Sequence, residues 1–343
     1  MIDIHEGYDL TRMTTFGLKA GCGRLIEYYN ADDLVTLYES GMLADVLPIG
    51  GGSNMLFVSP RYDGTVVHCR SARMEFSVPD AKGHVVCTAG AGVTLDDLCR
   101  EACARGLWGI ENLSGIPGEV GGASVQNVGA YGTEWKDVAV EIRCFDTATG
   151  RTISLSNADC SYGYRDSMFK HLDRTGSLIV YEAVVELSTL PKPVLSYAAL
   201  QKAFGDADPQ TLTPEMLRRE VIALRDAKLP SPVQTGSAGS FFKNPVVTPA
   251  EYDRIQAQTE TPVPGHRLDS GDVKLSAAWL IDKAGCKPLT RGGAALWPAQ
   301  PLVIVNATGR ATGADVVALE QAVINRVAER FGVTLHPEVI HIG

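Results

Sequence analysis

Ser240 lies among small residues in the segment 236–245, which reads Gly-Ser-Ala-Gly-Ser-Phe-Phe-Lys-Asn-Pro. Two phenylalanines, a lysine and an asparagine follow it, and this mixture of small, aromatic and polar residues is typical of a ligand site rather than of a protein core. No Gly-x-Ser-x-Gly pattern surrounds Ser240, which argues against a hydrolase nucleophile. The serine could equally serve only to form a turn after Gly239. The segment by itself therefore indicates a site without naming its chemistry.

Two charged residues elsewhere are further candidates for chemistry. Arg165 lies in the segment Ser-Tyr-Gly-Tyr-Arg-Asp-Ser at 161–167, and Glu338 lies close to the end of the chain in His-Pro-Glu-Val at 336–339. A guanidinium is suited to holding a carboxylate through two parallel hydrogen bonds. Arg165 could equally form an ion pair with Asp166 that closes a turn, and a carboxylate near a chain end is commonly only solvated.

Two glycine-rich segments predict a binding site for a large phosphate-bearing cofactor. The run Gly-Gly-Gly-Ser-Asn at 50–54 follows a short apolar strand at 46–49. Successive backbone N–H groups in such a run can bind an anion without obstruction, and the serine and asparagine can add hydrogen bonds. Met55 stands where a Rossmann fingerprint needs its third glycine, and no Walker A lysine follows. A second segment, 115–132, holds six glycines, too many for a regular element unless backbone approaches something closely.

The composition indicates a globular, acidic protein. The chain has 343 residues, of which 45% are hydrophobic and 21% charged, and its formal net charge is −9. This length predicts two or three domains. The negative charge, without a basic cluster, argues against a nucleic-acid partner or an anionic membrane surface. No apolar run is long enough to span a bilayer and the N-terminus has no leader pattern, so we expect a cytoplasmic protein.

The cysteines are expected to be reduced thiols without a metal. They are scattered through the chain and include no Cys-x-x-Cys pair. Cys99 and Cys103 are four residues apart on the apolar face of an expected helix, where small core residues are more typical than metal ligands. The eight positions are 22, 69, 87, 99, 103, 144, 160 and 286.

Strand and helix patterns alternate along the chain and predict an α+β fold. Helices are expected to begin at the capping residues Thr94 and Thr213. Strands are expected at 46–49, 55–58, 138–145, 178–187 and 302–306, and further helices at about 275–284 and 314–331. Prolines at 191 and 193 indicate a boundary. The predicted parts are a domain over 1–190 with two subdomains that divide near residue 68, a domain over 200–330, and a tail over 331–343 that carries Glu338.

Taken together, these motifs resemble the UDP-N-acetylenolpyruvoylglucosamine reductase (MurB) family, flavoenzymes of peptidoglycan precursor synthesis. The similarity includes Gly-Gly-Gly-Ser-Asn-Met-Leu at 50–56, Gln-Asn-Val-Gly-Ala-Tyr-Gly at 126–132 and the segments of Arg165, Ser240 and Glu338. It extends from Thr-Thr-Phe-Gly at 14–17 to the final Ile-Gly. Many members have an acidic residue where this chain has Gly51, a departure that binding through the backbone should tolerate.

The resemblance implies a fold. Residues 1–190 would form a two-part FAD-binding domain of the vanillyl-alcohol-oxidase (PCMH) type, and residues 200–330 an α+β substrate-binding domain. The tail over 331–343 would return to the flavin domain.

The resemblance also implies a reaction. The family reduces the enolpyruvyl double bond of UDP-N-acetylglucosamine enolpyruvate to give UDP-N-acetylmuramate, with noncovalent FAD and with NADPH as co-substrate. Arg165 and a protonated Glu338 would stabilise negative charge that builds on the substrate carboxylate. Ser240 would donate a proton to the neighbouring carbon. A serine hydroxyl is a weak acid, so we expect a relay around it, to which Lys228 could contribute. The three catalytic residues are expected to converge over the flavin.

The same resemblance assigns the remaining site residues. The lysines suit a substrate diphosphate, and the Tyr197 segment is similar to the subclass whose tyrosine-bearing loop closes over the substrate. Trp297 and Pro298 stand where relatives vary, so the resemblance constrains the uridine contacts least. The cofactor-binding positions are Gly50, Gly51, Gly52, Ser53, Asn54, Gly115, Gly121, Gly122, Ser124, Asn127 and Gly129, and the substrate-binding positions are Tyr131, Tyr197, Lys228, Asn244, Lys287 and Gln300.

Two alternative functions remain open from the sequence. One is a flavin-dependent oxidase on the same cofactor fold, a class that often tethers its flavin through His or Cys. None of the seven histidines lies in 50–54 or 115–132, which favours noncovalent FAD. The other is a nucleotide-sugar binding protein without turnover, and the complete set of Arg165, Ser240 and Glu338 argues against it.

Overall fold

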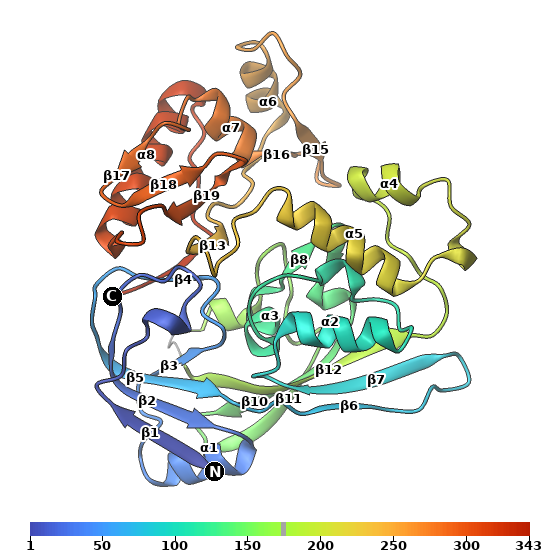
Figure 1. The fold of residues 1–343 in the computed structure, drawn as a ribbon, viewed down its shortest axis with the longest axis vertical. Helices are drawn as coiled ribbons and strands as arrows, with labels where there is room; N and C mark the ends of the chain where they lie inside the picture. The colour runs from blue at the N-terminus through green and yellow to red at the C-terminus, as the bar shows by residue number, and fades with distance from the viewer. Residues whose placement is uncertain (173–175) are drawn as a thin grey trace. The chain divides into compact units, whose positions relative to one another are not determined.

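The chain forms two compact units that each draw on separate stretches of the sequence (Figure 1). The computed structural model describes residues 1–172 and 176–343. The first unit comprises 1–8, 22–52 and 63–227, and the second comprises 9–21, 53–62 and 228–343. Two short N-terminal segments are thus built into the second unit. These units differ in extent from the domains predicted at 1–190 and 200–330. The division into a cofactor domain and a substrate domain at those bounds stays a prediction.

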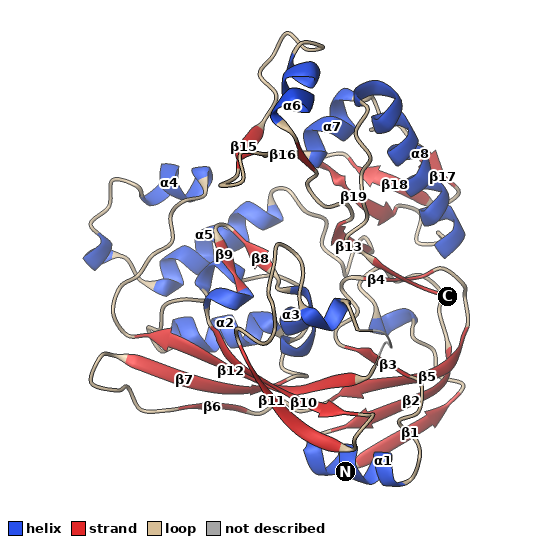
Figure 2. Cartoon of the chain, turned by 180° about the vertical axis from the view of Figure 1, so that it is seen from behind, coloured by secondary structure: helices blue, strands red, loops and turns tan. Residues whose placement is uncertain are grey.

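Two sheets form the frame of the first unit, and helices α2 and α3 lie on one face of the larger sheet (Figure 2). Every pair of strands in the larger sheet is antiparallel. Its order is β11 (Arg151–Ser156), β10 (Ala139–Asp146), β12 (Leu178–Ser188), β7 (His84–Gly90) and β6 (Met74–Phe76). The smaller sheet has the order β1 (Ile2–Glu6), β2 (Cys22–Tyr28), β5 (Tyr62–Cys69) and β3 (Val46–Ile49), and β3 and β5 pair in parallel. The other elements are α1 (Ala31–Glu39), α2 (Leu95–Ala104), α3 (Val120–Gln126), α4 (Ala198–Phe204), α5 (Pro214–Asp226) and the short pair β8 (Gly129–Ala130) and β9 (Thr133–Glu134).

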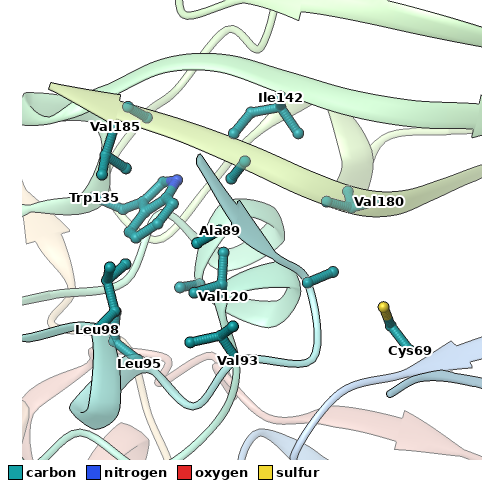
Figure 3. Packing of buried hydrophobic residues seen from close by; sticks show 14 of the residues in the cluster. Cys69, Ala89, Val93, Leu95, Leu98, Val120, Trp135, Ile142, Val180 and Val185 are labelled. Carbon is teal, nitrogen blue, oxygen red and sulfur yellow. The ribbon is translucent and has the colours of Figure 1, made fainter. Parts of the chain in front are cut away.

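The core of the first unit lies between the larger sheet and the helices that cover it (Figure 3). Trp135, Leu98 and Val120 are fully buried together with Ile142 and Ala89 from the sheet. Removing such side chains from water is the main favourable term in folding, about 25 cal/mol for each Å² of apolar surface. The sheet and α2 are therefore a stable platform for the loops that connect them.

Helix α2 begins where the sequence predicts. The Thr94 hydroxyl accepts a hydrogen bond from the Asp97 backbone N–H at 3.1 Å, so the predicted N-cap is confirmed. Cys99 and Cys103 are buried on its inner face, as a core role requires. Gly106 follows the helix with a φ of 70°, a conformation that glycine adopts at low cost.

The second unit packs α7 (Ala277–Lys283) and α8 (Gly313–Phe331) on a four-stranded sheet. The buried residues Phe241, Leu280, Ile304 and Val323 belong to its core. The C-terminal strand β20 (Ile340–Ile342) pairs in parallel with β4 (Met55–Phe57). The sheet order is β13 (Ser237–Ser240), β19 (Gln300–Asn306), β18 (Ala294–Trp297) and β17 (Thr290–Arg291), and β14 (Val246–Val247), β16 (Val273–Leu275), β15 (Gly265–Arg267) and α6 (Pro249–Gln256) complete the unit.

The strand and helix predictions are confirmed to within a few residues. The helices predicted at 275–284 and 314–331 are α7 and α8, and the strand predicted at 302–306 is β19, which begins two residues earlier. All eight cysteines lie in the described part of the chain and are buried, unbridged thiols. Within residues 1–172 and 176–343, no helix has the length and apolar character needed to cross a membrane.

Replacing Gly313 by alanine is expected to destabilise the protein, although alanine is the better helix former. Gly313 begins α8, and a methyl group there would overlap the backbone carbonyl oxygens of Phe57 and Val58. We expect Gly313→Ala to lower the free energy of unfolding by about 1 to 3 kcal/mol, measured by urea denaturation. The matched control is Ala318→Gly, an exposed position in the same helix, which should cost about 1 kcal/mol from helix propensity alone. A stabilising Gly313→Ala would contradict the close packing at this helix start.

Candidate functional site

Ser240 stands outside the core because β13 contains a bulge. Ser237 pairs with Val305 and Ser240 with Val303 on β19, so β13 has one residue more than its partner between these pairs. Gly239 supplies the left-handed conformation, with a φ of 67°. The Ser240 side chain is exposed, while the next residue, Phe241, is fully buried. The core contact of Phe241 therefore fixes the backbone next to the serine hydroxyl.

The structure brings Ser240 and Glu338 together within the second unit. The Phe241 carbonyl accepts a hydrogen bond from the Glu338 N–H at 2.8 Å. Phe242 and Pro337 form an antiparallel bridge beside it. Glu338 is half-buried. The two residues, nearly a hundred positions apart in the sequence, thus lie on neighbouring segments joined by backbone hydrogen bonds.

Asn54 ties the same C-terminal segment to the glycine loop. Its side-chain amide donates to the Glu338 carbonyl at 3.1 Å, and its own carbonyl accepts from the Ile340 N–H at 3.0 Å. Ser53, directly before it, is half-buried. The Asn54 side chain therefore positions the catalytic candidate Glu338. Contact of Ser53 and Asn54 with a cofactor stays a prediction.

Arg165 lies in the first unit, in a tight turn. Gly163 and Asp166 exchange two backbone hydrogen bonds across this turn, and Arg165 has a φ of 53°, which is uncommon for a residue with a side chain. Its guanidinium donates to the Gly129 carbonyl, and the Lys170 ammonium donates to the Arg165 carbonyl at 2.9 Å. Held from both sides in this way, the arginine is pre-organised, which is typical of functional sites.

The Asn127 side chain holds this turn in place by a hydrogen bond to its first residue, Gly163. The Asn127 amide donates to the Gly163 carbonyl at 2.7 Å and to the Glu134 carboxylate at 3.1 Å, and its side-chain oxygen accepts from the Lys136 N–H at 3.0 Å. Asn127 is fully buried and has a φ of 46°. The buried Ser124 hydroxyl likewise donates to the Val120 carbonyl at 2.9 Å. Both side chains therefore have structural partners, and their predicted contact with a cofactor remains a prediction.

The glycines of the two predicted cofactor segments lie against each other in the first unit. A Cβ atom on Gly51 would lie 3.0 Å from the Gly118 Cα, and one on Gly50 would lie 3.3 Å from the Glu119 carboxylate. Gly52 has a φ of 55°. A Cβ on Gly122, in contrast, would meet nothing within 4 Å. The backbone is thus closely packed on one side and open at Gly122, an arrangement that fits a bound diphosphate such as that of FAD.

Close packing also explains why glycine occupies the remaining predicted cofactor positions. A Cβ on Gly121 would lie 2.9 Å from the Ala91 Cβ, and one on Gly129 would lie 2.9 Å from the Arg165 guanidinium. Gly115 has a φ of 70°, and the Asp96 carboxylate accepts a hydrogen bond from its N–H at 2.6 Å. A side chain at Gly129 would therefore displace a catalytic candidate.

The sequence analysis missed His68 and Glu119, a contacting pair whose carboxylate lies next to Gly50 of the glycine loop. The His68 Nε2 atom lies 3.1 Å from the Glu119 carboxylate, and its Nδ1 atom lies 3.5 Å from the Glu27 carboxylate. His68 is buried. A histidine at the end of the apolar strand Val66–Val67 is the signal that could have identified it, because the strand pattern continues into the core there.

The predicted substrate residues Tyr131 and Tyr197 meet in the first unit. Their ring centroids are 4.9 Å apart at an interplanar angle of 79°, an edge-to-face contact. Burial raises the pKa of the Tyr131 hydroxyl. Arg225, which the sequence analysis also missed, donates from its Nε to the Gly115 carbonyl at 3.1 Å, and burial lowers the pKa of its guanidinium. Its spacing of four from Val221 on the apolar face of α5 is a signal that the sequence carries.

The other substrate candidates lie in the second unit. The Trp297 indole donates to the Lys228 carbonyl at 3.0 Å, so the turn between Trp297 and Gln300 is held at the Lys228 segment. The Asn244 side-chain oxygen accepts from the Ala277 N–H at 3.0 Å, at the start of α7. Lys287 forms an exposed ion pair with Asp282 at 2.7 Å, a kind of contact that is easily exchanged for a ligand.

Comparison with known proteins decides the family. Residues 231–342 match the profile of the UDP-N-acetylenolpyruvoylglucosamine reductase C-terminal domain, and residues 39–156 match an FAD binding domain. A UDP-N-acetylenolpyruvoylglucosamine reductase of Bacteroides fragilis is 38% identical over 337 residues, which cover 98% of this chain and 99% of that protein. One from Neisseria meningitidis serogroup A is 41% identical over 334 residues, 96% of this chain and 95% of that protein. The chain belongs to this reductase family.

A solved structure supports the same assignment. The crystal structure of the reductase (MurB) from Thermus caldophilus superimposes with a TM-score of 0.68 at 26% identity, and the match covers 100% of this chain and 99% of that one. The predicted family, the α+β class and the FAD-binding domain followed by a C-terminal domain are therefore confirmed.

Replacing Asn127 is expected to release the Arg165 turn and to destabilise the first unit. Asn127→Gly keeps the left-handed conformation accessible but leaves the Gly163 carbonyl and the Lys136 N–H without their partner, at a cost of about 2 to 4 kcal/mol in the free energy of unfolding. Asn127→Ala should lose about 1 kcal/mol more, because alanine resists a positive φ. Urea denaturation of both variants measures the two effects separately. Equal stability of the glycine variant and the native protein would show that these hydrogen bonds do not hold the turn.

Proposed function

We propose that the chain is an NADPH-dependent, FAD-containing UDP-N-acetylenolpyruvoylglucosamine reductase, which converts UDP-N-acetylglucosamine enolpyruvate to UDP-N-acetylmuramate. Family membership over nearly the full length supports the activity. The observation that carries the residue assignment is the backbone hydrogen bond that places Glu338 beside the segment of Ser240. The enzyme is thus an oxidoreductase of peptidoglycan precursor synthesis.

FAD fits the glycine segments of the first unit. Gly50, Gly51 and Gly52 present backbone without side chains, and the space beside Gly122 is open. The other proposed contacts are Gly115, Gly121, Gly129 and, through backbone or remaining hydrogen-bonding capacity, Ser53, Asn54, Ser124 and Asn127. When bound, FAD would accept hydride from NADPH and deliver it to the terminal carbon of the enolpyruvyl group.

Three side chains are proposed to serve the reduction of the double bond. Hydride addition at the terminal carbon leaves negative charge on the adjacent carbon and on the carboxylate attached to it. Arg165 and a protonated Glu338 would bind this carboxylate and stabilise the charge as it develops, an effect of a few kcal/mol per donor, typically about 3. Ser240 would then give its proton to the adjacent carbon. Protonation of this kind contributes about 10² to 10⁴-fold to a rate.

The tyrosine pair and the second-unit residues are proposed to hold the rest of the substrate. Tyr131 and Tyr197 already contact each other, so Tyr197 on its exposed loop can cover a ligand that lies beside Tyr131. Lys228 and Lys287 would neutralise the diphosphate, and Asn244 and Gln300 would donate hydrogen bonds. Both substrates are multiply charged nucleotides that do not cross membranes unaided. We therefore place the enzyme in the cytoplasm.

An anaerobic two-step experiment tests the function. NADPH added to FAD-loaded protein should abolish the visible flavin absorbance, and UDP-N-acetylglucosamine enolpyruvate added next should restore it. A non-catalytic binding protein would show no bleaching. A flavin oxidase would recover its colour with oxygen but not with the enolpyruvyl substrate.

Ser240→Ala is expected to separate the two steps. The variant should lose its absorbance with NADPH at the native rate and regain it at least about 100-fold more slowly with substrate, because the proton donor is missing. Stopped-flow absorbance measures both rates. Ser270→Ala, at an exposed serine of the same unit that hydrogen bonds only locally to Asp272, is the control and should match the native protein. Equal recovery rates in Ser240→Ala and the control would remove Ser240 as the donor.

A further inference from the structure

A partly exposed histidine lies next to the catalytic candidates of the second unit but has no part in the proposed chemistry. His341 is on β20, and its Nε2 atom lies 2.7 Å from the Glu320 carboxylate of α8. The His341 side chain is 30% exposed and that of Glu320 only 10%. A carboxylate so deeply buried is costly unless it is paired, which makes the imidazole its necessary partner.

The same imidazole contacts the neighbours of both Glu338 and Ser240. Its ring packs edge-to-face on Phe241, with centroids 6.2 Å apart at 84°. The backbone of Val339, the residue after Glu338, also favours the protonated form of the ring and so raises its pKa. Phe241 directly follows Ser240, and its carbonyl accepts the Glu338 N–H at 2.8 Å. The His341 ring thus packs on Phe241, the residue that follows Ser240 and whose carbonyl binds Glu338.

A positively charged ring strengthens the contact with Glu320. A neutral imidazole has one N–H, whereas a protonated one has an N–H on each nitrogen, so its Nε2 always donates to the Glu320 carboxylate. The hydrogen bond to Glu320 raises the pKa of His341, although burial opposes this. Glu320 is the charged group that faces the ring among the described residues. The other described neighbours of the His341 ring are uncharged. They are Leu56 of β4, which pairs with His341, and Phe241.

We propose that His341 is a positioning residue for the reduction: its charged ring, anchored on Glu320, holds the backbone of Glu338 and Ser240 in register. The inference rests on the proposed function, because it assigns a purpose to a contact between proposed catalytic segments. It adds a residue that acts through others and does not itself touch the substrate.

The position of the charge sets the direction of the pH dependence. Because the pKa of His341 is raised in the folded protein, the stabilisation is complete below about pH 6.5, the ordinary value for histidine, and is lost as the pH rises through the folded-state pKa. The rate of the substrate step should therefore fall on the alkaline side, above pH 6.5, while reduction by NADPH is unaffected by this group.

Two variants and a control test the proposal. His341→Phe keeps a ring against Phe241 but removes the hydrogen bond to Glu320, and should lower kcat of the substrate step by roughly ten-fold with little change in KM. Glu320→Gln keeps a hydrogen-bond partner but removes the charge, and should move the alkaline limb of the kcat profile to lower pH. NMR titration of the His341 ring should show the same shift without any turnover. His266→Gln changes an exposed histidine on β15 and should leave both the rates and the alkaline limb of the kcat–pH profile at their native values.

The outcomes separate this inference from the proposed function. If the native protein does not oxidise NADPH with the enolpyruvyl substrate, the function itself is wrong. If the native protein turns over and Glu320→Gln shifts the NMR titration but not the kcat limb, the histidine is only structural and the positioning role is overturned. A lower melting temperature with native kcat would overturn it in the same way. If His341→Phe does not fold, the pH at which kcat of Glu320→Gln falls on the alkaline side decides whether His341 has the positioning role.

Discussion

The backbone hydrogen bonds of the C-terminal segment are the constraint on which the candidate site depends. Glu338 donates to Phe241 and Ile340 donates to Asn54, so the last residues of the chain are held between two much earlier segments. Unlike side-chain contacts, such bonds fix the segment whatever its side chains are, and a buried N–H without its partner would be costly. The Glu338 carboxyl and the Ser240 hydroxyl take their places from this arrangement, and so does the His341 ring.

Buried polar side chains perform the corresponding task in the first unit. Arg218 on α5 forms two hydrogen bonds with the Asp96 carboxylate of α2, at 2.6 and 3.0 Å, and Asp96 also accepts from the Gly115 N–H. Burial works against the charge on Asp96, yet these hydrogen bonds hold its pKa below the ordinary value. Breaking such a network leaves an uncompensated buried charge, so it specifies one arrangement of helices and glycine segment. Asn127 does the same for the Arg165 turn with a neutral group.

Close backbone packing explains why glycine is required at several predicted cofactor positions. Gly51 lies against Gly118 and Gly121 lies against Ala91, so the two glycine segments support each other before any ligand is considered. At Gly122, in contrast, the missing side chain leaves open space. A glycine-rich sequence therefore combines two functions here, contact between loops and access for a ligand, and the sequence does not distinguish them.

The sequence by itself determined the elements and the family. Local signals suffice for these: Thr94 caps a helix through a residue three positions away, and the apolar faces of α2, α5 and α8 repeat at the helical period. The motifs around Arg165, Ser240 and Glu338 each lie within a few residues and so could be read directly. Tertiary structure alone decided that residues 9–21 and 53–62 join the second unit, and that His68 and His341 each meet a carboxylate far along the chain. The physical reason is the range of each interaction. Caps and periodicity act over one or two turns, whereas strand pairing and contacts between a histidine and a distant carboxylate join segments whose proximity no local pattern encodes.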